Sequence, residues 1–179
     1  MKKEILRKSI HTILALAFVL GASIFDYKVL ITTAIVLFIL FVFVRVMRIY
    51  ARVGTVPRVT FGEFFFAIGL ISTIYITLPV NIELFQTSIL ILAFSDPLAA
   101  LFGMNFGKHT YRILDEKRTL EGSFVCLFIS TVIVLLFGHT LFISLGVAFV
   151  LTIIEAFSLR GSDNLFLPTT TAIMLGILV

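Results

Sequence analysis

The sequence predicts an all-α integral membrane protein, a polytopic bundle of about seven transmembrane helices. Hydrophobic residues make up 60% of the 179 residues and charged residues only 13%, a balance that excludes an ordinary soluble domain. The apolar residues fall into runs approaching the roughly 20 residues that a spanning helix needs, with short polar connections between them. No fixed-period repeat or low-complexity linker divides the sequence, so we expect a single domain over residues 1–179.

The first three predicted helices follow polar segments. A basic N-terminus leads into an apolar run that ends at Phe25, a pattern that a cleavable signal peptide shares. The second run covers residues 29–44. A connection with several arginines follows, and Thr60 with Glu63 matches the capping-box pattern that opens a helix, here predicted over 64–80.

The remaining predicted helices flank one polar stretch. The fourth begins near Glu83, and we expect it to break at residues 95–97, because the residue before a proline disfavours helical geometry and proline suits the first position of a new helical segment. The last three are predicted over 121–138, 140–159 and 165–179.

The basic residues predict an orientation. With a cytoplasmic N-terminus and alternating sides, thirteen of the fourteen Lys and Arg residues lie on the cytoplasmic side and only Lys28 lies outside, as the positive-inside rule requires. The basic isoelectric point therefore needs no nucleic acid to explain it. Acidic and amide residues gather on the same side, namely Asp96, Asp115, Glu116, Glu121, Glu155, Asp163 and Asn164.

This one-sided polarity bears on the class of protein. An ionised carboxylate costs at least ~2.5 kcal/mol at the centre of a membrane helix, so Asp96 and Glu155 within or beside apolar runs indicate a partner, an ion or a function. A transporter places such groups near the midplane, whereas an enzyme that joins a cytosolic substrate to a lipid needs them at one interface. The pattern favours the enzyme; a small transporter and a structural subunit remain alternatives.

The residue types limit the chemistry of such an enzyme. The sequence has no zinc-spaced Cys/His cluster, no Walker-type glycine loop and no G-x-S-x-G nucleophile motif. It has carboxylates beside Lys and Arg. Mg²⁺ is held by one or two carboxylates with substrate phosphates, and basic side chains neutralise phosphate oxygens. This combination is typical of phosphoryl or nucleotidyl transfer.

Asp96 and the small residues after it allow two interpretations. A helix that begins at Pro97 would direct its free N–H groups toward an anion near Asp96, although Asp96 could instead only cap that helix. Ala99, Gly103 and Gly107 fall on roughly the same side as Asp96. They leave room for a ligand or for another helix, and helix packing is the commoner use of such a glycine pair.

Three groups of residues resemble one family. The series Asp96, Ala99, Gly103 and Gly107, followed by Lys117-Arg118-Thr119-Leu120-Glu121-Gly122-Ser123, resembles the D-x-x-A-x-x-x-G-x-x-x-G and K-[KR]-[ST]-x-E-G-S elements of the CTP-dependent lipid kinases. Arg7-Lys8-x-x-His11, and Glu155-Ala156-Phe157-Ser158 with Asp163-Asn164 and Pro168, resemble two further elements. The family includes dolichol or polyprenol kinase, phytol kinase and yeast-type diacylglycerol kinase, and it is related to phosphatidate cytidylyltransferase. Ser95 departs from the glycine that often precedes the aspartate.

The resemblance implies a multi-pass enzyme that uses CTP and Mg²⁺ to phosphorylate a lipid alcohol, either a polyprenol or dolichol, phytol or diacylglycerol, with its active site facing the cytoplasm. Cytidylyltransferase-like nucleotidyl transfer is the alternative; it is less favoured because the K-R-x-x-x-x-K-D and H-G-G-x-x-D-R elements are missing after Glu121. The expected partners are a nucleoside triphosphate, a lipid alcohol and the membrane, with no nucleic acid. A homo-oligomer stays open.

The resemblance also assigns expected roles within the site. Asp96 and Glu121 are expected to hold the metal and, with Lys117, to be catalytic. Asp96 is also the candidate general base, which stays open, as do the roles of Arg7 and His11. The other residues expected to contact the nucleotide are Gly103, Gly107, Lys108, Arg118, Gly122, Ser123, Glu155, Ser158, Asp163 and Asn164.

Overall fold

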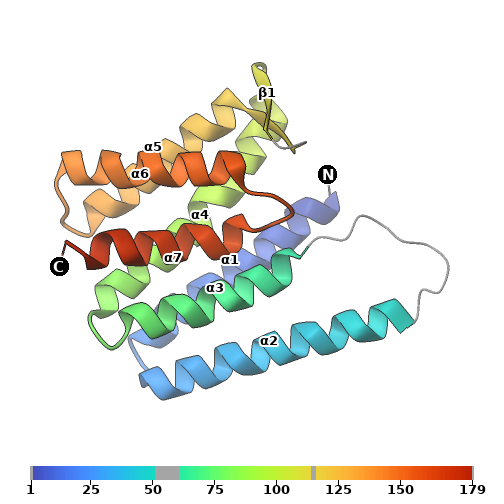
Figure 1. Cartoon of the computed structure of the whole chain (residues 1–179), viewed down its shortest axis with the longest axis vertical. Helices are drawn as coiled ribbons and strands as arrows, with labels where there is room; N and C mark the ends of the chain where they lie inside the picture. Colours follow the sequence, from blue (N-terminus) through green and yellow to red (C-terminus); the bar gives the residue numbers. More distant parts are fainter. Residues whose placement is uncertain (1, 51–60, 114–115, 179) are drawn as a thin grey trace.

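The computed structural model describes residues 2–50, 61–113 and 116–178 (Figure 1). Within these residues the chain forms seven helices and one two-stranded hairpin. They are α1 (Lys2–Ala22), α2 (Tyr27–Tyr50), α3 (Gly62–Thr77), α4 (Ile82–Phe106), β1 (Thr110–Ile113), β2 (Glu116–Thr119), α5 (Leu120–Leu136), α6 (Leu141–Phe157) and α7 (Asp163–Gly176). The prediction of seven helices is confirmed for the described residues. Besides α4, two helices differ clearly from the expected bounds: α1 includes the basic N-terminal segment, and α2 ends at Tyr50 and not at Val44.

Successive helices run in opposite directions, which gathers the polar segments at one end of the bundle. In Figure 1 the β1–β2 hairpin lies at the top, the N-terminus and the α6–α7 connection lie below it to the right of α6 and α7, and the C-terminus lies at the left. We call the end with the hairpin, the N-terminus and the α6–α7 connection the hairpin end. Residues that lie far apart in the sequence, including those of the resembling motifs, therefore meet there.

Helix α4 is the central element and packs against α1, α5 and α7. Its Phe85 and Ile89 belong to a hydrophobic cluster shared with α1, α2 and α3. Its Leu84 and Ile91 belong to a second cluster shared with α5, α6 and α7. Because one helix contributes to both clusters, α4 joins the two groups of helices into one bundle.

The predicted break at Ser95-Asp96-Pro97 is wrong, because α4 continues through Pro97. A proline inside a helix leaves the carbonyl four residues earlier without its usual N–H donor, and here that carbonyl belongs to Ala93. The hydroxyl of Thr12 on α1 donates a hydrogen bond to it at 3.0 Å, which replaces the missing donor. The expected helix start at Pro97 is therefore absent, and so are the free N–H groups and the capping role of Asp96 that depended on it.

The segment expected to be a basic loop contains an antiparallel hairpin. Thr110 pairs with Thr119 and Ile113 with Glu116, and the N–H of Leu120 donates to the carbonyl of His109 at 2.9 Å. The side chain of Thr119 then accepts a hydrogen bond from the N–H of Gly122 and caps α5. The hairpin therefore leads directly into the first turn of α5.

Two features of the predicted layout fall partly outside the described residues. Thr60 of the predicted capping box lies outside them, and α3 begins after Phe61 without a side-chain cap. Asp115 of the acidic group also lies outside them.

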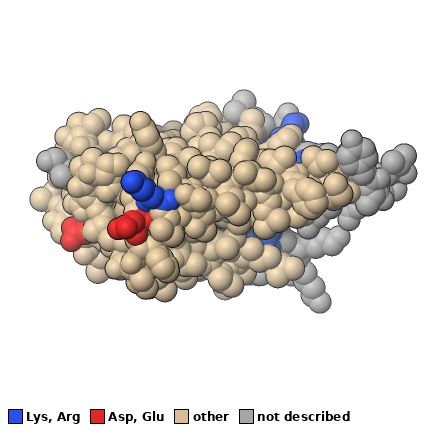
Figure 2. All heavy atoms as spheres, turned by 90° about the horizontal axis from the view of Figure 1, so that it is seen from below, with Lys and Arg blue, Asp and Glu red and all other residues tan. Residues whose placement is uncertain are grey.

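Two of the described helices, α2 and α4, are long and apolar enough to cross a membrane, and α3, α5 and α6 are shorter apolar helices. With 17 residues each, α5 and α6 are about 25 Å long at ~1.5 Å per residue, against a hydrocarbon core of ~30 Å. The face of the molecule seen in Figure 2 is largely free of charged side chains. Membrane residence thus has support from two helices, and seven spans and the cytoplasmic orientation stay predictions.

Candidate active site

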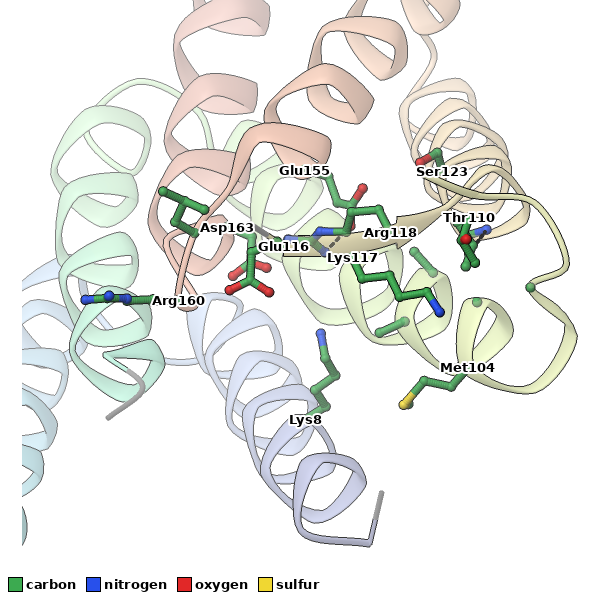
Figure 3. Close-up of a pocket in the computed structure, with 18 of the residues that line it drawn as sticks. Lys8, Met104, Thr110, Glu116, Lys117, Arg118, Ser123, Glu155, Arg160 and Asp163 are labelled. Carbon is green, nitrogen blue, oxygen red and sulfur yellow. Dashed lines mark hydrogen bonds and ion pairs between the residues drawn. The ribbon is translucent and has the colours of Figure 1, made fainter. Parts of the chain in front are cut away.

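A polar cavity of about 1080 Å³ lies at the hairpin end (Figure 3). Its walls come from α1, α4, the hairpin, α5, α6 and the connection to α7. Cavities that bind small molecules usually measure ~300–1000 Å³, so this one has room for a nucleotide. Among the residues predicted from the sequence, those lining it are Gly103, Gly107, Lys117, Arg118, Gly122, Ser123, Glu155 and Asp163.

A buried ion pair joins α1 to α4 beside this cavity. The Nζ of Lys8, which lines the cavity, donates to Oδ2 of Asp96 at 2.5 Å. The two side chains are only 9% and 5% exposed. Asp96 itself is not among the residues that line the cavity, and its contact with the cavity is the ion pair that holds the ammonium group of Lys8 in position.

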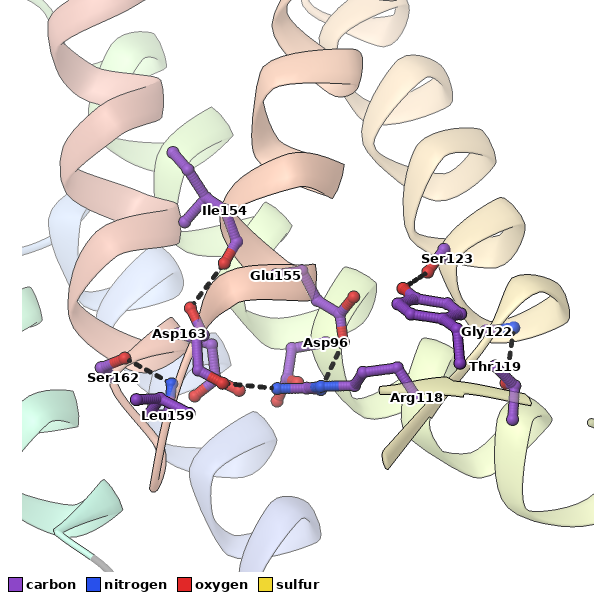
Figure 4. Close-up of polar contacts among 12 residues, drawn as sticks. Asp96, Arg118, Thr119, Gly122, Ser123, Ile154, Glu155, Leu159, Ser162 and Asp163 are labelled. Carbon is purple, nitrogen blue, oxygen red and sulfur yellow. Dashed lines mark hydrogen bonds and ion pairs between the residues drawn. The ribbon is translucent and has the colours of Figure 1, made fainter. Parts of the chain in front are cut away.

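A second ion pair joins the hairpin to α6 (Figure 4). The guanidinium of Arg118 donates to Oε1 of Glu155 at 2.5 Å and to the carbonyl of Ser158 at 2.9 Å. Burial alone would lower the pKa of Arg118, but the carboxylates of Glu155, Asp163 and Asp96 together raise it above its ordinary value. Arg118 therefore stays charged and fixes β2 against the end of α6.

Asp163 and Asn164 begin α7 and differ in where they point. The buried carboxylate of Asp163 lines the cavity, and its Oδ1 accepts from the N–H of Asn164 at 2.9 Å. The side chain of Asn164 donates to the carbonyl of Gly62 at 3.2 Å and is not among the lining residues. The structure thus gives Asp163 access to a ligand, whereas Asn164 joins α7 to α3. We call Lys8, Asp96, Arg118, Glu155 and Asp163 the charge cluster.

The predicted glycines bring α4, the hairpin and α5 into close contact. A Cβ added to Gly103 would lie 2.6 Å from Oγ1 of Thr119, and one added to Gly122 would lie 2.9 Å from the carbonyl oxygen of Ala99. A Cβ on Gly107 would meet Thr119 at 2.5 Å. These glycines also line the cavity. Because they have no side chain, they allow the close packing of these elements and also leave the cavity wall free.

Glu121 lies away from the charge cluster. Its carboxylate accepts hydrogen bonds from the N–H groups of Lys108 and His109 at 3.1 Å each and contacts Nδ1 of His109 at 2.8 Å. Glu121 and Lys108 are not among the lining residues of the cavity. Ser123 is, and its hydroxyl is 2.6 Å from that of Tyr111 on β1. The structure thus joins Glu121 to the base of the hairpin and does not bring it beside Asp96.

Two carboxylate oxygens of the charge cluster have unused hydrogen-bonding capacity. Within the described part of the chain, Oδ1 of Asp96 and Oε2 of Glu155 are buried and have no hydrogen-bond partner. No group of three or more His, Cys, Asp or Glu side chains among the described residues could hold a metal by itself. Glu155 and Asp163 line the cavity, and this pair fits Mg²⁺, which takes one or two carboxylates and completes its coordination with water and substrate phosphates.

Sequence reasoning missed the importance of Lys8. The basic N-terminal segment was explained by membrane orientation, and only the Arg7-Lys8-x-x-His11 element carried a signal that pointed to the site. His11, whose role was left open, stacks on Phe66 with the ring centroids 4.7 Å apart. His11 thus packs α1 against α3, and Lys8, one turn earlier, reaches the charge cluster.

Fold and site together define a helical protein with a buried charge cluster beside a nucleotide-sized polar cavity. Among proteins of known function, the chain is similar to phytol kinase of Synechocystis sp. (strain ATCC 27184 / PCC 6803 / Kazusa), with 32% identity over 139 residues. The matched region is 72% of this chain and 59% of the relative, so the chain spans less than two thirds of the relative's length. No family model matches the chain, and no solved structure matches it.

Proposed function

We propose that this protein is a membrane-embedded lipid kinase that transfers the γ-phosphoryl group of CTP to the hydroxyl of a lipid alcohol at the cytoplasmic interface. The observation that carries the proposal is the charge cluster at the wall of the polar cavity. It is supported by the similarity to a phytol kinase and by the resemblance of the motifs that line the cavity. A polyprenol or dolichol, phytol and diacylglycerol are the acceptors to be tested.

The nucleotide phosphates would lie in the polar cavity. Lys8 and Lys117 line it and supply cationic groups that stabilise charge on the transferring phosphoryl group. Arg118, fixed by Glu155, adds a third. The first turn of α5, with Gly122 and Ser123, also lines the cavity, and the positive end of a helix favours anions. This replaces the helix start that we had expected at Pro97.

Mg²⁺ would be held by Glu155 and Asp163, whose carboxylates line the cavity, together with the nucleotide phosphates. It would neutralise the negative charge that develops on the phosphate oxygens during transfer. In the transfer itself, the alcohol oxygen forms a bond to the γ-phosphorus while the bond from that phosphorus to the β–γ bridging oxygen breaks and CDP leaves. The hydroxyl proton passes to a carboxylate. Oδ1 of Asp96, which is buried and has no hydrogen-bond partner among the described residues, is our candidate.

The test is a transfer assay on the purified protein in lipid nanodiscs with Mg²⁺. CTP is labelled on the γ-phosphate in one reaction and on the α-phosphate in another, with a panel of lipid alcohols and phosphatidate. We expect γ-label in a phosphorylated alcohol, and replacing CTP by ATP measures the nucleotide preference. Label from the α-phosphate in a phosphatidate product would instead identify nucleotidyl transfer. No transfer from either position would contradict both and favour a transporter.

A further inference from the structure

A second, smaller cavity opens between α1 and α4 on the outer surface of the bundle. It measures about 340 Å³, and we call it the lateral cavity. Most of its wall is apolar and consists of Ile13 from α1 with Phe94, Pro97, Leu98 and Leu101 from α4. The side chain of Ile13 is 66% exposed, so the cavity opens toward the surroundings of the bundle.

Thr12 and the carbonyl of Ala93, two polar groups at this wall, already have hydrogen-bond partners. The hydroxyl of Thr12 lines the lateral cavity and donates to the carbonyl oxygens of Lys8 and Ala93, each at 3.0 Å. The carbonyl of Ala93 is the group that Pro97 leaves without a helical donor. A hydrocarbon chain can therefore occupy this cavity without leaving the Thr12 hydroxyl or the Ala93 carbonyl unpaired, which would be costly.

The inner end of the lateral cavity reaches the charge cluster. Lys8 lines both the lateral cavity and the polar cavity, and its Nζ binds Asp96. Pro97, the residue after Asp96, lines the lateral cavity. An apolar molecule in the lateral cavity would thus have its inner end at the ion pair that borders the polar cavity.

We propose that the lateral cavity binds the hydrocarbon chain of the acceptor, with its hydroxyl at the Lys8 end, and that the acceptor is a single-chain alcohol. The proposal rests on the kinase function proposed above. If a methylene occupies about as much space as a water molecule in the liquid, ~30 Å³, a cavity of about 340 Å³ holds roughly eleven of them. That is one chain, and a two-chain lipid would leave its second chain outside.

A binding test that requires no catalysis uses photolabelling of the full chain in nanodiscs. The probe is a long-chain primary alcohol with a diazirine in the middle of its tail. The test variant is Ile13→Trp, and its matched control is Leu20→Trp, because Leu20 lies on the same helix, is 67% exposed and does not line the cavity. We expect label on the α1 or α4 residues of the lateral cavity and a loss of at least about tenfold in Ile13→Trp only, since the indole overfills the space.

Transfer kinetics provide the second measurement. We expect Ile13→Trp to raise KM for a long single-chain alcohol by about tenfold or more, the scale that changes of pocket fit usually reach, with KM for CTP unchanged. A short-chain alcohol should be phosphorylated equally well by Ile13→Trp and by Leu20→Trp. A diacylglycerol should be phosphorylated poorly even by the unsubstituted protein. Label elsewhere, an unchanged KM for the long alcohol, or a preference for diacylglycerol would overturn the tail site. If the unsubstituted protein transfers no phosphoryl group, the kinase proposal fails, while labelling still reports on the cavity.

Discussion

Removing both charges of the Lys8–Asp96 pair should give a protein that folds normally and transfers phosphoryl groups at least about a hundredfold more slowly. The perturbation is the double variant Lys8→Met/Asp96→Leu, compared with Lys8→Met and Asp96→Leu alone. Both side chains are almost fully buried, at 9% and 5% exposure. The comparison separates a structural role of this ion pair from a role in the reaction.

The expected magnitudes follow from that burial. Removing one partner of a buried ion pair leaves an uncompensated charge and costs ~3–5 kcal/mol, whereas replacing both by apolar groups is often neutral or stabilising. A loss of 3 kcal/mol lowers the ratio of folded to unfolded protein roughly a hundredfold. Each single variant should therefore be clearly destabilised and the double variant should not. Losing a preorganised charge at a site of phosphoryl transfer lowers the rate about 10²- to 10³-fold. The transfer rate of the double variant should therefore fall by at least this factor.

Stability can be followed by far-ultraviolet circular dichroism during heating in nanodiscs, since the sequence has no tryptophan for fluorescence. The control is Glu63→Gln. Glu63 pairs with Arg45 at 4.0 Å, and these side chains are 31% and 22% exposed, so the substitution should cost about 1 kcal/mol or less. If the double variant folds and its transfer rate is within tenfold of the normal rate, Lys8 and Asp96 have no role in the reaction. A double variant as unstable as the singles would show that the pair is structural.

Three further substitutions test other parts of the site. Arg118→Lys should reduce transfer by about tenfold or more at nearly unchanged stability, because lysine keeps the charge but cannot reproduce both hydrogen bonds of the guanidinium. Gly122→Ala should lower stability by ~1–3 kcal/mol, because its Cβ would lie 2.9 Å from a backbone oxygen of α4, whereas Gly146→Ala, with open space around its Cβ, should be neutral or stabilising. Glu121→Gln should raise KM for CTP about three- to tenfold with little change in kcat, because it weakens the base of the hairpin.

The outcomes that would contradict these expectations differ in kind. Normal transfer by Arg118→Lys would mean that charge alone suffices at that position. A stable Gly122→Ala would mean that α4 and α5 can separate without cost. If Glu121→Gln instead lost activity by orders of magnitude, with KM unchanged, Glu121 would have the metal-binding role that the sequence resemblance assigned to it.

The seven helices could be predicted because each one contains a long apolar run, which indicates a helix from neighbouring residues alone. The course of α4 through Pro97 could not, because the Ala93 carbonyl that Pro97 leaves without a donor is compensated by the hydroxyl of Thr12, 81 residues before Ala93 in the chain. A contact between such distant residues has no signature in a local pattern. The hairpin was missed for a different reason, because its strands pair over only four residues each and Leu114-Asp115 between them is not one of the glycine-containing pairs that mark a tight hairpin turn.

The candidate site was predicted in part. Placing the polar residues at one interface already indicated that Arg118, Glu155 and Asp163 would meet, and they do line one cavity. The position of Glu121 could not be read from its motif, because neighbouring residues on a helix point about 100° apart. Gly122 and Ser123 therefore face the cavity while Glu121 contacts the hairpin.

The energetics of the charge cluster argue that it serves the reaction more than the fold. Apolar side chains of similar volume would stabilise such a position at least as well as a buried ion pair, and apolar residues are abundant elsewhere in this chain. A kinase acting on lipids must bring a polar phosphate and an apolar acceptor to one point while excluding water from the transfer. Lys8 borders both the polar and the lateral cavity, and Asp96 fixes it there. The ion pair thus lies where the two substrates of the proposed reaction would have to meet.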